Sequence, residues 1–227
     1  MIGHAITSNS FTLSNTMVPH CTSIKDLGIT LDSSLKFKSH IMDIIARAKQ
    51  RAALIHRCFA SRSIKNLTRA YSVYIRPLLE YATTVWSPSQ ITLITAIESV
   101  QKQFTKRLPG LKNLDYSERL KFLGLQSLEH RRLKFDLILC YNIIHGQSSI
   151  PLDKMFILNR NTTLRGHSLK ISLPLPKNNT SKTFFAYRVI SPWNSLQSDV
   201  VMATTTNKFK TLLNKADLSK FLIFPST

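Results

Sequence analysis

The sequence predicts a mainly α protein, in which a short β-hairpin precedes a helical bundle and an irregular α+β extension follows it. Apolar and polar residues alternate through much of 1–33, which is typical of strands. From 34 to 146 apolar residues recur at helical spacing. The spacing fails in 147–182, where proline, asparagine and serine accumulate, and short helical patterns return in 183–227.

Two runs near the start are expected to pair with each other as the hairpin. They are FTLSNTMV at 11–18 and SIKDLGITLD at 23–32, with Pro19, His20 and Cys21 between them. A lone hairpin is marginally stable in water, so it needs another element to lie on. We expect Leu27, Ile29 and Leu31 to stay partly uncovered.

The first two helices have clear apolar faces. The first carries Ile41, Ile44, Ile45, Ala48, Ala52, Ile55 and Phe59 on one side. The second starts at Ser63, and its apolar positions are Ile64, Leu67, Tyr71, Tyr74, Leu78, Ala82 and Val85. Pro77 interrupts this helix at a cost of roughly 3 kcal/mol. Either one kinked helix or two helices can satisfy the pattern, and the unbroken apolar phase favours the kink.

Later helices show local start and stop signals. Asp115 and Glu118 have the spacing of a capping box, and Gly124 can end the helix that follows them. Ser127 and Gly146 bracket a longer helix. The chain therefore divides into a hairpin at 1–33, a helical bundle at 34–108, a helical continuation at 109–146, a linker-like loop at 147–182 with one possible strand, and a C-terminal extension at 183–227.

The charge of the chain indicates an anionic partner. Lysine and arginine total 31 against 12 acidic residues, which gives a net charge of +19. The excess has two centres, because 36–107 holds 13 bases and 3 acids while 151–227 holds 11 and 3. RNA, DNA or an RNA–DNA hybrid, bound through its backbone, is the first expectation. A basic helical module that the host has recruited to bind an acidic protein is the alternative.

Residues of the first two helices are the candidates for phosphate contact, which would be blind to base sequence. They are Lys36, Lys38, Arg47, Lys49, Arg51, Arg57, Arg62 and Lys65. Two other features are interpreted structurally: Tyr71, Tyr74 and Tyr81 as core residues rather than base-stacking platforms, and His130-Arg131-Arg132 as a solvated basic face.

Catalytic and metal-binding patterns are missing from the sequence. It contains no two adjacent acids and none of the motifs GxxxxGK[ST], HExxH or GxSxG. Cys21, Cys58 and Cys140 have no zinc-ligand spacing and are expected to be free thiols. We therefore assign no catalytic residue, metal or cofactor, and expect an intracellular protein, in nucleus or cytoplasm, without a membrane partner.

Six segments in a fixed order resemble one known family. They are SIKDLGITLDSSLKFKSHI, YIRPLLEYATTVWSP, IESVQKQFTKRLPGL, LDYSERLKFLGLQSLEHRRLKFDLILCYNIIHG, LRGHSLKI and FFAYRVISPWNSL. Together they resemble the C-terminal portion of reverse transcriptases from non-LTR, LINE-type retrotransposons of the jockey group, over about residues 24–213. The resemblance implies a palm-end hairpin, a thumb at 34–108 that grips a template–primer duplex, and a C-terminal extension. It also implies a primer-grip-like role for Lys25, Asp26, Leu27 and Gly28.

The chain also departs from this family. The fingers, most of the palm and the paired catalytic aspartates have no counterpart here, and Leu196-Gln197 stands where the family has Leu-Pro. The resemblance therefore implies a truncated element copy that keeps nucleic-acid affinity and does not synthesise DNA alone.

Overall fold

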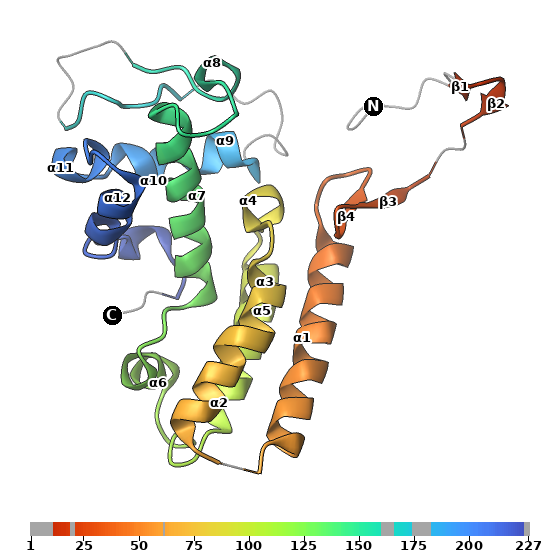
Figure 1. The fold of residues 1–227 in the computed structure, drawn as a ribbon, viewed down its shortest axis with the longest axis vertical. Coiled ribbons are helices and arrows are strands. Elements are labelled where there is room, and N and C mark those ends of the chain that lie inside the picture. Colours follow the sequence, from red (N-terminus) through yellow and green to blue (C-terminus); the bar gives the residue numbers. More distant parts are fainter. Residues whose placement is uncertain (1–10, 19–20, 61, 160–165, 174–182, 225–227) are drawn as a thin grey trace.

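The computed structural model describes residues 11–18, 21–60, 62–159, 166–173 and 183–224. Two small antiparallel strand pairs come first and helices follow, which confirms the predicted mainly α class (Figure 1). The strands are β1 (Thr12–Leu13), β2 (Thr16–Met17), β3 (Ser23–Asp26) and β4 (Ile29–Asp32).

Each predicted strand run folds back on itself, so the expected pairing between the two runs is wrong for the described strands. β1 pairs with β2 across Ser14 and Asn15, and β3 pairs with β4 across Leu27 and Gly28. All four turn residues have positive φ, the conformation that two-residue hairpin loops of the I′ type require. Leu27, Ile29 and Leu31 were expected to stay partly uncovered. This is wrong for Ile29, which is buried against the helices, whereas Leu27 is 81% exposed.

Helix α1 (Lys38–Cys58) buries the predicted apolar face. It begins after Phe37, whose φ is 55°. The Asp32 carboxylate holds the approach to the helix, because it accepts backbone N–H bonds from Ser34 and Phe37 at 2.9 Å each. These bonds lower the pKa of Asp32 even though partial burial raises it. β4 and α1 are thus joined through a rigid turn.

The next helix continues across Pro77, as favoured, but its irregularity is a π-helical turn. α2 (Ile64–Ala70), η1 (Tyr71–Ile75) and α3 (Arg76–Glu80) follow without a break. A π turn takes up an extra residue, which shifts the buried face by one position. Ile75 and Leu79 are therefore fully buried, whereas Tyr74, expected in the core, is 53% exposed.

This helix ends at Glu80, earlier than the apolar pattern predicts. Ala82 has a φ of 53° and precedes a separate short helix, α4 (Thr83–Trp86). Trp86 is buried and its indole N–H donates to the carbonyl of Tyr81 at 2.8 Å. The Tyr81 hydroxyl in turn donates to the carbonyl of Leu27 at 3.0 Å. The helix end, α4 and the β3–β4 turn are thereby tied together.

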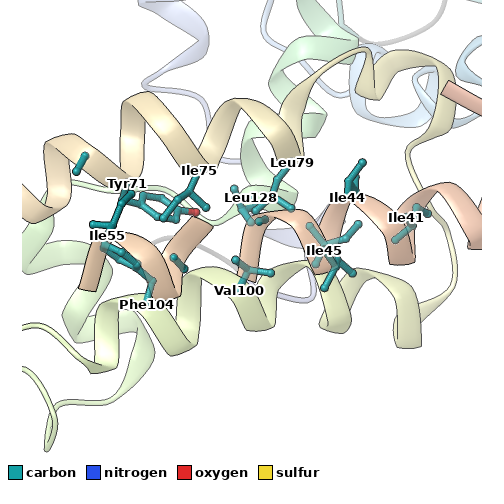
Figure 2. Close-up of a cluster of buried hydrophobic side chains, with 14 of the residues drawn as sticks. Ile41, Ile44, Ile45, Ile55, Tyr71, Ile75, Leu79, Val100, Phe104 and Leu128 are labelled. Atoms are coloured by element: carbon teal, nitrogen blue, oxygen red, sulfur yellow. The ribbon is translucent and has the colours of Figure 1, made fainter. Parts of the chain in front are cut away.

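Helix α5 (Ile91–Lys106) completes the first core and runs parallel to α1. Phe37 and Gln90, which precede the two helices, line one cavity, and His56 and Arg107 at their other ends line another. Figure 2 shows Tyr71 and Ile75 directed into the same space as Val100 of α5. The predicted capping box of Asp115 and Glu118 is present at the start of α6 (Tyr116–Leu123).

A second core lies on α7 (Leu128–Ile144), which begins at the predicted cap Ser127. Leu128 belongs to the first core and Leu137 to the second, so the two cores meet within this helix. The remaining elements are α8 (Leu152–Met155), α9 (Phe185–Arg188), α10 (Ile190–Asn194), α11 (Ser198–Val201), α12 (Thr206–Leu213) and η3 (Ser219–Phe221).

The stretch expected as a linker-like loop contributes to this second core. Among its described residues, Phe156 and Ile171 are buried, and Leu158 pairs with Ile171 in a single β-bridge. The amide of Asn194 exchanges two hydrogen bonds with the backbone of Ile171, at 2.9 and 2.8 Å. The described parts of 147–182 therefore pack on α7 and α10 rather than only connecting them.

Candidate nucleic-acid interface

The eight predicted phosphate-contact residues are all exposed, but they do not form one face. Arg47 pairs with Asp43 at 2.8 Å, and Arg51 donates to the carbonyl of Tyr74 at 3.4 Å, so both lie on the flank of α1 toward η1. Lys49 lies on the other flank, where it lines a cavity with residues of α5. Lys36 lies before α1, at the opposite end from Arg57.

Cations instead gather at one end of the bundle, which we call the basic end. α1 and α5 finish there and α2 begins there (Figure 1). The residues that we assign to the basic end, all exposed, are Lys49, Arg57, Arg62, Lys65, Lys106 and Arg107; Lys49 lies in the middle of α1 and is included because it lines a cavity with Arg107. The first four are among the predicted contacts, and the last two were not expected.

A cavity of about 250 Å³ opens at the basic end between α1 and α5. Lys49, His56, Gln103 and Arg107 supply its polar lining, and the described residues that line it include no carboxylate. The His56 ring packs on Phe104 with 4.5 Å between ring centroids, and its Nε2 has no hydrogen-bond partner among the described residues. Such a cavity offers ammonium, guanidinium and amide donors to an oxyanion.

The basic end is rich in cations, and the segments that form it contain no acid. The sequence has no aspartate or glutamate in 44–79 or in 99–114. Burial lowers the pKa of His56, and the positive charges of Arg107 and Arg62 lower it further. Cations at the ends of α1 and α5 also stabilise the helix dipoles. Arg62 and Lys65 lie at the start of α2, where the helix dipole does not stabilise a positive charge.

The segment with the expected primer-grip-like role forms the exposed β3–β4 turn. Lys25 and Asp26 end β3, and Leu27 and Gly28 form the two-residue loop. Leu27 has a φ of 45°, which is uncommon for a residue with a bulky side chain. Its carbonyl accepts the hydrogen bond from Tyr81, so the bundle holds this turn in place. The turn lies near the start of α1, away from the basic end (Figure 1).

The aromatic residues divide between core and surface. Tyr71 is fully buried and donates to Gln101 at 2.8 Å, as expected for a core residue. Tyr74 and Tyr81 are 53% and 58% exposed, so the core interpretation is wrong for these two.

The sequence His130-Arg131-Arg132 is not the expected solvated face. His130 is 8% exposed and Arg132 is 2% exposed, because α7 packs between the two cores. The guanidinium of Arg131 forms a bidentate ion pair with the carboxylate of Glu80. Burial, with smaller contributions from the positive charges of Lys134 and Arg131, lowers the pKa of His130 to about 4.

The described residues contain no group of three or more histidine, cysteine, aspartate or glutamate side chains that could hold a metal ion. Within the same residues, no helix combines the length and the apolar character needed to cross a membrane.

Comparison with known proteins gives a partial link to mobile elements. The chain is 29% identical over 131 residues to an uncharacterized protein of Caenorhabditis elegans. The aligned residues make up 56% of the chain and 66% of that protein. It is 27% identical over 96 residues to a probable RNA-directed DNA polymerase from transposon X-element of Drosophila melanogaster, which covers 41% of the chain and 11% of the polymerase. The chain thus matches less than two thirds of each protein's length. No family model matches, and no solved structure matches significantly.

Proposed function

We propose that the chain is part of a retrotransposon reverse transcriptase, and that it binds RNA, DNA or RNA–DNA hybrid duplexes through their phosphate backbones. The observation that carries the proposal is the basic end, where exposed cations gather at the ends of α1 and α5 and the start of α2, and where the described residues that line the cavity between α1 and α5 include no carboxylate. Lysine and arginine contacts of this kind position a duplex without reading its bases. The partial similarity to the transposon polymerase of Drosophila melanogaster supports the origin.

The proposed role within the parent protein is that of a thumb. The parallel helices α1 and α5 with the antiparallel α2–η1–α3 form a rigid bundle around one apolar core. Such a bundle can carry cations at fixed distances from one another, which is what a backbone grip requires. The β3–β4 turn, held by Tyr81, is proposed as the primer-grip-like element at the other end of this bundle. Membership of the LINE-type jockey group is part of the same proposal.

Charge reversal tests where nucleic acid binds. Lys49, Arg57, Arg62 and Arg107 would be changed together to glutamate, and the affinity of the whole chain for two unrelated duplexes would be measured by fluorescence anisotropy. We expect a loss of at least about tenfold that is equal for both duplexes, since each lost phosphate contact weakens binding uniformly.

The matched control reverses exposed cations elsewhere. Lys154, Lys208, Lys215 and Lys220 are exposed and lie outside the basic end, and changing all four to glutamate alters the net charge by the same amount. We expect a smaller loss of affinity for this control. A control that weakens binding more than the basic-end variant, or a loss confined to one duplex, contradicts the proposal.

A further inference from the structure

A second group of cations lines a cavity between α7 and α12, away from the basic end. The cavity has a volume of about 240 Å³. Arg131 and Lys134 of α7 and Lys210 of α12 line it, together with Gln126, Phe135 and Asn214. Among the residues that the structure describes, no carboxylate lines this cavity. The sequence brings Arg131 and Lys134 to one side of α7 by their three-residue spacing, while Lys210 comes from a helix 80 or so residues further along.

The charges in this cavity are only partly compensated. Arg131 is paired with Glu80, at 2.9 Å between Nη2 and Oε2. Lys134 is 6% exposed, and its ammonium group donates to the amide oxygen of Asn214 at 2.9 Å. None of the ion pairs among the described residues includes Lys134. A buried ammonium with a neutral partner has donors left for an anion and gains from one.

We propose that this cavity binds a single phosphate group, held by Lys134 and Lys210 with Arg131 behind them. Its volume is below the roughly 300–1,000 Å³ of ordinary ligand pockets, so it suits one tetrahedral oxyanion rather than a whole nucleotide. The ammonium groups of the two lysines supply charge-assisted hydrogen bonds. Gln126 adds an amide next to them.

The protonation of Lys134 agrees with this assignment. Burial and, to a smaller extent, the positive charge of Arg131 together lower the pKa of Lys134 to about 8. A phosphate in the cavity would favour the charged form of the ammonium group. The site is independent of the nucleic-acid interface proposed above, so either can fail without the other.

The test is a titration of the whole chain with inorganic phosphate at constant ionic strength, followed by backbone amide NMR signals. We expect saturable shifts confined to the amides of α7 and α12 around Lys134 and Lys210. Lys210→Ala, at an exposed position, should weaken the binding about tenfold, the effect of losing one charge-assisted contact. Lys208→Ala, also exposed on α12 but outside the cavity lining, should leave it unchanged.

Other outcomes decide against the site or identify the source of the phosphate. Shifts that grow without saturation, or equal weakening by both lysine variants, would overturn the proposal. Oligonucleotides of equal length with and without a 5′-phosphate separate the sources. Shifts from the phosphorylated one alone would assign the site to a strand end. Competition by inorganic phosphate and small phosphate esters, with no effect of either oligonucleotide, would assign it to a small molecule.

Discussion

Two ion pairs of equal length should differ widely in their contribution to stability. Arg188 and Asp136 lie 2.8 Å apart with side chains 17% and 5% exposed, while Arg47 and Asp43 lie 2.8 Å apart with side chains 45% and 52% exposed. Removing one partner of a buried pair leaves an uncompensated charge and costs about 3–5 kcal/mol. An exposed pair contributes about 0–1 kcal/mol, because water solvates both charges.

The surroundings of Arg188 place the expected cost of removing its charge near the upper end of the range of about 3–5 kcal/mol. Its guanidinium donates to both Asp136 oxygens at 2.8 Å and to the carbonyl of Thr84 at 2.7 Å. α9 is thereby joined to α7 and α4. Burial raises the pKa of Asp136, and the bonds from Arg188 oppose this rise. In Arg188→Met the carboxylate must either stay charged without its partner or take up a proton.

Urea unfolding followed by circular dichroism would measure the difference. We expect Arg188→Met to lose about 3–5 kcal/mol and Arg47→Met to lose about 1 kcal/mol at most. The double variant Asp136→Leu with Arg188→Met should lose less than Arg188→Met alone, because no buried charge is left unpaired. Equal losses for the two single arginine variants would refute the reasoning from burial.

Two other predictions concern His130 and the π turn. The folded pKa of His130, about 4, lies below its unfolded value of 6.5, so stability is lost as pH falls from 6.5 toward 4, by about 3 kcal/mol in all. Urea unfolding across this range should show a smaller loss for His130→Asn, and parallel curves for the two proteins would contradict the assignment. Ile75→Ala should cost about 2–5 kcal/mol and Tyr74→Ala less than about 1 kcal/mol in the same assay. The reverse order would exclude the shift in buried face at η1.

The predictions that the structure confirms rest on local chemistry. The capping box of Asp115 and Glu118 and the cap at Ser127 were readable from the sequence because their partners lie within a few residues. The apolar face of α1 was readable for a similar reason, since a long regular helix repeats its signal. The mainly α class followed from several such segments together.

The predictions that fail depend on which elements pack together. Tyr74 fits the 3.6-residue period, and only the π turn before Pro77 moves it to the surface. The charged stretch at His130 is typical of a solvated face, but α7 packs between two cores and buries it. A sequence period shows which residues share a face, not how many neighbours cover the helix.

The candidate interface was predictable in part. Lys49, Arg57, Arg62 and Lys65 were nominated from charge alone, and all are exposed at the basic end. Arg107 was not nominated, because its place in the lining of the same cavity as Lys49 depends on the parallel packing of α1 and α5. The lack of acids in 44–79 and in 99–114 is the sequence signal that would have joined the two helices.

Salt dependence tests the central claim most directly. The affinity of the chain for an RNA–DNA hybrid of arbitrary sequence would be measured by anisotropy from about 50 to about 200 mM salt. If roughly 5 phosphates are neutralised, log affinity should fall with log salt at a slope of about −4 to −5, and an acidic polypeptide should compete poorly. A slope near zero, or displacement of the hybrid by the acidic polypeptide at equal charge concentration, would contradict backbone binding and favour a protein partner.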